Sequence, residues 1–209
     1  MLWAGFLAGI AGYVDAICYL RLGHAFAANM TGNLVDIGLA AARGDWPRAL
    51  WIAAIVCAFI AGIIPARLLL RAKVSVRAVL LLAALLMIPA ATGHVAGAAI
   101  PLLAAVMAMQ NETATHGIVS VNVAFVTGNM QRLGELIATG DKPVTRHFRR
   151  YELMIVAVLV FYACGAALGA MAAVWNAPAL LAAIAALTAA ALCPERWIRS
   201  PSRQADRVP

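Results

Sequence analysis

Charged residues are scarce in this chain of 209 residues. Asp, Glu, Lys and Arg together make up 12% of it, whereas hydrophobic residues make up 64%. Average soluble domains carry about 25% charged residues. The shortage excludes an ordinary soluble domain and predicts an all-α membrane protein, because a helix satisfies its own backbone hydrogen bonds in lipid.

Residues that bind metals or carry out catalysis are also few. The four His residues lie in four separate segments, and the four Cys residues show no CxxC spacing. Neither pattern is typical of a metal site. We also find no nucleotide-binding glycine loop and no Ser/His/Asp set in a recognisable context. The sequence therefore predicts no enzyme, no cofactor and no metal site.

Long charge-free runs are what the chain has instead. They cover residues 49–66, 78–111 and 153–194. About 20 residues cross a bilayer as a helix, so each of the last two runs must fold back as a hairpin of two helices. The N-terminal run lacks a basic start and contains Asp15, so we expect a retained helix rather than a signal peptide. The sequence thus predicts a lipid-bilayer partner and six transmembrane helices, at about 2–20, 49–66, 78–92, 95–114, 153–174 and 177–193.

The distribution of Lys and Arg predicts the orientation. In the six-helix arrangement, thirteen of the sixteen lie on one face and three on the other, namely Arg21, Arg43 and Arg48. Cytoplasmic loops carry the excess of positive charge. This predicts an inner (plasma) membrane protein of bacteria with both termini in the cytoplasm. Because the basic residues flank the apolar runs, the net charge of +7 does not indicate nucleic-acid binding.

The chain contains an internal repeat. Residues 31–47 (TGNLVDIGLAAARGDWP) and 127–143 (TGNMQRLGELIATGDKP) share 8 of 17 residues without a gap. The repeat divides the chain into a first half (1–93), a second half (94–194) and a cytoplasmic tail (195–209). Three helices per half would insert the two halves in opposite orientations, as in many transporters.

Each TGN segment is predicted to be a re-entrant half-helix. Residues 31–42 would form about 18 Å of helix, little over half of a hydrocarbon core of about 30 Å. Thr is a good N-cap, and the free amides of a helix start near the midplane would favour an anion or a polar solute. An eight-helix model, in which both TGN segments cross the membrane and the halves are parallel, remains open, as does a purely structural role of TGN in capping and close packing.

Several polar residues within or beside the apolar segments are candidates for lining a pathway, because such residues are costly in lipid. Asp15 and Glu112 are the candidates for proton coupling. The alternatives are that Asp15 pairs with Arg21 or with backbone amides, and that Glu112 is hydrated at the cytoplasmic interface. The predicted substrate-binding residues are Asp15, Asn29, Thr31, Gly32, Asn33, Asn111, Glu112, Thr127, Gly128 and Asn129.

The segments GYVDAICYLRLGHAFAANMTGNLVDIGLA, MAMQN and FVTGNMQRLGELIA resemble the YoaK family of bacterial multi-pass membrane proteins, a domain of unknown function (1275). The resemblance extends from about Leu2 to Cys193. It implies a six-helix inner-membrane protein and no particular activity.

Together these patterns predict a transporter or channel for a small polar or anionic solute. The alternative is a non-transporting assembly or accessory protein of the membrane, in which the repeat is only a folding device. Homo-oligomerisation is open: Gly165 and Gly169 form a GxxxG pair, for which we expect internal helix packing rather than dimerisation.

Overall fold

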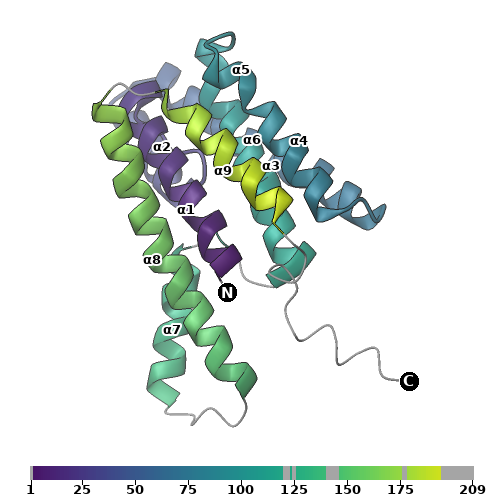
Figure 1. The fold of residues 1–209 in the computed structure, drawn as a ribbon. Coiled ribbons are helices and arrows are strands. Elements are labelled where there is room, and N and C mark those ends of the chain that lie inside the picture. The colour runs from purple at the N-terminus through teal and green to yellow at the C-terminus, as the bar shows by residue number, and fades with distance from the viewer. Residues whose placement is uncertain (1, 120–122, 124–125, 140–145, 176–177, 194–209) are drawn as a thin grey trace.

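A computed structural model of the protein describes residues 2–119, 123, 126–139, 146–175 and 178–193. Every regular element in these ranges is helical, as expected (Figure 1). The elements of the first half are α1 (Leu2–Ile17), the π-helix η1 (Cys18–Gly23), α2 (Met30–Ala42), α3 (Trp46–Arg71), α4 (Val76–Leu86) and α5 (Ile88–Ala91). Those of the second half are the 3₁₀ turn η2 (Ala96–Ala98), α6 (Ala99–Glu112), the π-helix η3 (Thr113–Val119), α7 (Val126–Thr139), α8 (Arg146–Val174) and α9 (Ala179–Leu192).

A helix stands at each of the six predicted transmembrane segments. Three helical stretches are long and apolar enough to cross a membrane: Leu2–Gly23, Trp46–Arg71 and Glu152–Val174. Val76–Ala91 and Ala179–Leu192 are apolar but shorter. Large apolar side chains are exposed along the outer faces of α3 and α8, as expected for lipid contact; examples are Ile60, Ile64, Val160 and Leu168.

The chain turns between α5 and η2. Pro89 stands before this turn, in the first turn of α5, where its missing N–H costs no hydrogen bond. The chain reverses afterwards, where Gly93 has a φ of +77°. Among the cysteines of the apolar helices, Cys18 is buried, whereas Cys57 and Cys164 are exposed.

Two pairs of helices, here called the central pairs, make the most extensive contacts in the bundle. Helix α1 packs along α8, and α3 packs along α6. Gly9 and Tyr13 of α1 meet Gly165 and Gly169 of α8 in the same order, so these two helices run parallel. The short apolar helices α4 and α9 pack on each other, and α9 also packs on α1.

Glycine permits the close approach within both central pairs. A Cβ atom at Gly165 would collide with the backbone carbonyl of Gly9, and one at Gly169 with that of Tyr13. In the other pair, a Cβ atom at Gly62 would collide with the backbone of Ala105. Small residues at helix contacts let backbones approach closely in membranes. The GxxxG pair of α8 therefore serves packing within the chain, as the sequence predicts.

Alanine at Gly165 should destabilise the protein, because a new methyl group in a filled contact forces the backbones apart at a cost of about 1–3 kcal/mol. We expect the Tm of Gly165→Ala in detergent to fall clearly. Gly134→Ala on α7 is the control, since nothing lies within 4 Å of a Cβ atom there. It should be neutral or slightly stabilising, because Ala favours helix over Gly by about 1 kcal/mol. Equal Tm values for the two variants would contradict the described packing.

Candidate functional site

The first TGN segment begins a helix of about the expected length. Helix α2 has 13 residues and starts at Met30. Its N-cap is Asn29, whose Oδ1 accepts a hydrogen bond from the N–H of Gly32 at 3.2 Å. The predicted cap, Thr31, lies inside the helix and is exposed. An Asn side chain at the N-cap accepts a hydrogen bond from a first-turn N–H, just as a Thr side chain would. Asn29 and Thr31 are two positions apart in the sequence.

Asn33 holds the loop that precedes its own helix. Its side chain is completely buried. The amide group donates to the carbonyl oxygen of Phe26 at 2.8 Å, and its oxygen accepts from the N–H of Phe26 at 2.9 Å. A Cβ atom at Gly32 would lie within 3.0 Å of the Phe26 ring. In this conformation, the polar atoms of Asn33 are engaged with the backbone.

Asp15, on α1, binds the same loop at residues 27–29. Its carboxylate accepts hydrogen bonds from the backbone N–H groups of Ala27, Ala28 and Asn29, at 2.7, 2.6 and 3.1 Å. It also accepts one from the hydroxyl of Tyr162 on α8, at 2.5 Å. Of the two alternatives for Asp15, the structure shows the one with nearby backbone amides.

These contacts show that the chain turns back along α1. Asp15 precedes the end of η1 at Gly23 by eight residues, or about 12 Å along a helix axis. To reach the carboxylate, residues 27–29 must therefore lie beside α1, well before the end of η1. The first turn of α3 lies near the end itself, because the guanidinium of Arg48 donates to the carbonyl oxygens of Gly23 and His24.

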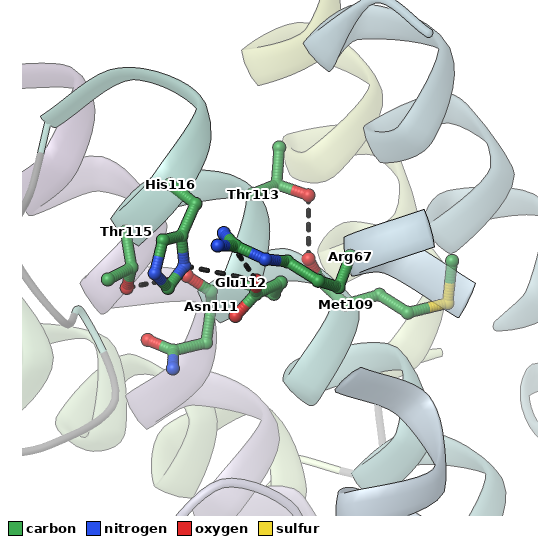
Figure 2. Close-up of polar contacts among 7 residues, drawn as sticks. All are labelled: Arg67, Met109, Asn111, Glu112, Thr113, Thr115 and His116. Atoms are coloured by element: carbon green, nitrogen blue, oxygen red, sulfur yellow. Dashed lines mark hydrogen bonds and ion pairs between the residues drawn. The ribbon is translucent and has the colours of Figure 1, made fainter. Parts of the chain in front are cut away.

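A second polar cluster lies between α3, α6 and η3 (Figure 2). Glu112 is its centre, with a side chain only 10% exposed. One carboxylate oxygen lies 3.3 Å from Nη1 of Arg67 and 3.0 Å from Nδ1 of His116. Figure 2 shows the guanidinium of Arg67 and the ring of His116 directed at this carboxylate. We call Arg67, Glu112 and His116 the Glu112 cluster.

The Glu112 cluster stands where the helix changes its winding. Residues 113–119 form the π-helix η3, in which the hydroxyls of Thr113 and Thr115 donate to the carbonyl oxygens of Met109 and Asn111. π-Helical turns are rare and occur frequently at functional sites. Asn111 is half-buried. The alternative of a freely hydrated Glu112 is not what the structure shows.

Gln110, one residue before Asn111, is fully buried and was missed as a candidate. Its amide nitrogen donates to the carbonyl oxygen of Leu7 at 2.7 Å, while its side-chain oxygen has no hydrogen-bond partner among the described residues. The orientation is fixed, because exchanging the two atoms would place oxygen against oxygen. A buried acceptor without a partner costs about 1–3 kcal/mol. The sequence signal was available, since Gln110 begins the polar run of residues 110–112.

The second TGN segment opens α7, where Thr127 is exposed, Gly128 is half-buried and Asn129 is buried. Helix α7 packs on the first part of α8 and projects beyond the start of α1 (Figure 1). Helix α2 lies instead toward the end formed by η1 and the start of α3. The described residues therefore do not show the two TGN helix starts facing each other across one cavity.

The ten predicted site residues thus fall into separate places. Asp15 lies on α1, and residues 29 and 31–33 lie at the start of α2 beside the loop after η1. Asn111 and Glu112 lie on α6, and residues 127–129 lie on α7. A cavity of about 380 Å³ lies elsewhere, and none of the ten lines it. Within the described ranges, no three His, Cys, Asp or Glu side chains lie close enough together to hold a metal ion.

The fold and the polar clusters can now be set beside known proteins. The profile of a family described as "Protein of unknown function (DUF1275)" matches residues 3–193, nearly the whole chain. The chain belongs to this family. It is also 46% identical to the UPF0700 transmembrane protein YoaK of Bacillus subtilis over 59 residues, which is 28% of this chain and 26% of that protein. No solved structure matches.

Membership in the DUF1275 family establishes a membrane protein and confirms the resemblance seen in the sequence. The aligned part spans only about a quarter of the Bacillus protein's length. The family description names no substrate, so a function has to be argued from the residues of this chain.

Replacing Asp15 by Leu should release the loop of residues 24–29, because three backbone N–H groups lose their acceptor. We expect faster amide hydrogen exchange at Ala27–Asn29 and a lower Tm, with a loss of about 3 kcal/mol or more, since hydrogen bonds to a charged group contribute about 1.5–3 kcal/mol each. Tyr162→Phe removes one of the four bonds and should have a smaller effect. Asp36→Leu on α2 is the control and should leave exchange at residues 27–29 unchanged. Unchanged exchange in the Asp15 variant would contradict the described contacts.

Proposed function

We propose that this protein is a transporter or channel of the bacterial inner membrane for a small polar or anionic solute, built from two halves of opposite orientation. The observation that carries the proposal is the reciprocal packing of the halves. The first helix of each half packs on the long helix of the other: α1 on α8, and α6 on α3. The last helices, α4 and α9, pack on each other. A pseudo-two-fold axis in the membrane plane would produce this reciprocal packing of helices between the two halves.

Equivalent positions support this symmetry. The TGN repeat relates residues 96 positions apart, so Gly9 corresponds to Ala105. In the long helices the spacing is 103, so Gly62 corresponds to Gly165. The structure pairs Gly165 with Gly9 and Gly62 with Ala105, which are corresponding contacts. A π-helix also ends the first helix of each half, at Cys18–Gly23 and Thr113–Val119.

The polar groups supply the elements of a gated pathway. The Glu112 cluster ties α3 to the junction of α6 and η3, on the side proposed to be cytoplasmic. An ion pair between two helices can act as a gate, because its separation exposes both charged groups to a solute. Arg67 would then offer its planar guanidinium to an anion, and Gln110 would offer its side-chain oxygen to a hydrogen-bond donor. Asp15 and Tyr162 hold the opposite side closed by joining the loop after η1 to α8.

One observation favours the alternative, a non-transporting accessory protein. The side chains of Asp15 and Asn33 are saturated with hydrogen bonds from their own chain, as in a structural lock. The two functions differ in what Glu112 does. A structural ion pair affects only stability, whereas a gate affects flux at equal stability.

Flux through proteoliposomes tests the proposal. We expect the wild-type protein to take up at least one solute from a panel of small organic anions and neutral polar metabolites. Glu112→Gln, which keeps the shape and removes the charge, should change the rate by tenfold or more. The control is Glu135→Gln, which breaks an exposed ion pair with Arg132 on α7 and should leave the rate unchanged. An inserted, folded wild-type protein that moves no solute would favour the accessory role.

Cysteine labelling tests the opposed halves. In a variant whose four native cysteines are replaced by Ala, Asp45→Cys and Asp141→Cys mark corresponding sequence positions of the two repeats. Opposed halves predict that an impermeant maleimide labels position 45 from outside intact cells and position 141 only after the membrane is opened. Labelling of both from the same side would support parallel halves and eight crossings.

A further inference from the structure

A cavity of about 380 Å³ lies away from both polar clusters, between η1, α5 and the start of α9. Its volume falls within the range of about 300–1,000 Å³ that is typical of small-molecule sites. The walls consist of Ile17, Arg21, Leu22, Ala90, Ala91, Pro178, Ala179, Leu180 and Leu181. We call it the Arg21 cavity.

The lining combines apolar walls with one cationic side chain. Arg21 is the only charged residue among the nine, and no lining residue is acidic. A guanidinium presents five N–H donors in a planar fork that matches phosphate and carboxylate groups. The ligand that fits such a lining has an anionic group and an apolar body.

The start of α9 adds to the positive potential of the same cavity. Three residues of its first turn, Ala179, Leu180 and Leu181, contribute to the wall. No side chain caps this helix. The first turn of a helix carries a partial positive charge of about +0.5. In α9 the N–H of Leu181 donates to the carbonyl oxygen of Pro178 at 3.0 Å, so this N–H is not offered to a ligand. The hydroxyl of Tyr13 donates to the carbonyl oxygen of Ala179 at 3.0 Å and fixes this turn beside α1.

The cavity also stands at a suitable depth for an amphiphile. Arg21 and Leu22 belong to the last turn of η1, and Ala90 and Ala91 end α5, so the lining collects the ends of elements rather than their middles. In the proposed orientation these ends lie at the outer surface of the membrane, where a lipid-like molecule has its charged group. Apolar side chains continue the wall from there.

We propose that the Arg21 cavity binds a phosphate or carboxylate group carried on an apolar chain. The guanidinium of Arg21 and the first turn of α9 hold the anionic group, and Leu22, Leu180 and Leu181 contact the chain. This site is independent of the transport proposal, because it requires no passage across the membrane.

The test uses n-decyl phosphate as the probe, added to purified protein in an uncharged maltoside detergent. Binding is followed by the rise in Tm and by native mass spectrometry. n-Decanol, which has the chain without the charge, is the ligand control. We expect saturable binding of decyl phosphate and at least tenfold weaker binding of decanol.

Variants locate the binding to this cavity. Arg21→Gln removes the cation and Leu180→Trp fills the space, so each should weaken binding at least tenfold, whereas Arg21→Lys keeps a cation and should retain part of the affinity. Arg43→Gln is the matched control: it removes an exposed cation at the end of α2 that does not line the cavity. Size-exclusion profiles check folding, and if one of the two disruptive variants does not fold, the other decides.

Two further probes distinguish the source of the anion. Arg21-dependent retention of phosphatidylglycerol over phosphatidylcholine in nanodiscs would identify a membrane lipid. Arg21-dependent binding of inorganic phosphate would identify a free anion as sufficient. Absence of decyl phosphate binding, equal affinity for decanol, or an equal loss in Arg43→Gln would overturn the proposal.

Discussion

Buried backbone N–H groups outside a helix need a hydrogen-bond partner, because an unpaired buried donor costs free energy. At residues 27–29 the partner is the carboxylate of Asp15, which lies about 12 Å before the end of its own helical stretch. This contact makes it feasible for the chain to turn back along α1 before α2 begins. Asn33 completes the arrangement by bonding both backbone groups of Phe26. The start of α2, and with it the position of the first TGN segment, depends on this pair of side chains.

Close packing of small residues determines how the remaining helices meet. Within a membrane, apolar side chains gain little by leaving lipid for one another, so van der Waals contact between backbones matters more. Gly165 and Gly62 provide that contact in the two central helix pairs. The hydroxyl of Tyr162, one turn before Gly165, reaches Asp15 because α1 and α8 lie so close together. The glycine contact thus also completes the hydrogen bonding of the loop.

The two halves share a plan but differ in their charged groups. Asn111 stands 96 residues after Asp15, so a neutral amide takes the place of the carboxylate in the second half. Glu112, in turn, corresponds to Ala16, and its partner Arg67 comes from the first half of the chain. One side is therefore joined by a carboxylate that binds backbone, and the other by a carboxylate that binds cationic or ionisable side chains.

The positions of the helices could be read from the sequence, since the lengths of charge-free runs and the breakers between them are local properties. The polar character of residues 110–112 and the start of a helix at each TGN segment were equally visible. The partners of these groups were not. Tyr162 lies 147 residues from Asp15 in the chain, and Leu7 lies 103 residues from Gln110, so only the packing of α1 against α8 and α6 decides that they meet.

The sequence by itself determined a helical membrane protein of the DUF1275 family, with apolar segments and polar residues at recognisable places. The tertiary structure decided which of those polar residues are already satisfied and which are not. Asp15 and Asn33 bind the neighbouring backbone, whereas the side-chain oxygen of Gln110 has no hydrogen-bond donor among the described residues. A hydrogen bond requires two groups to lie close together in space, and that depends on how the helices pack. The hydropathy of the sequence shows only which residues are costly to bury.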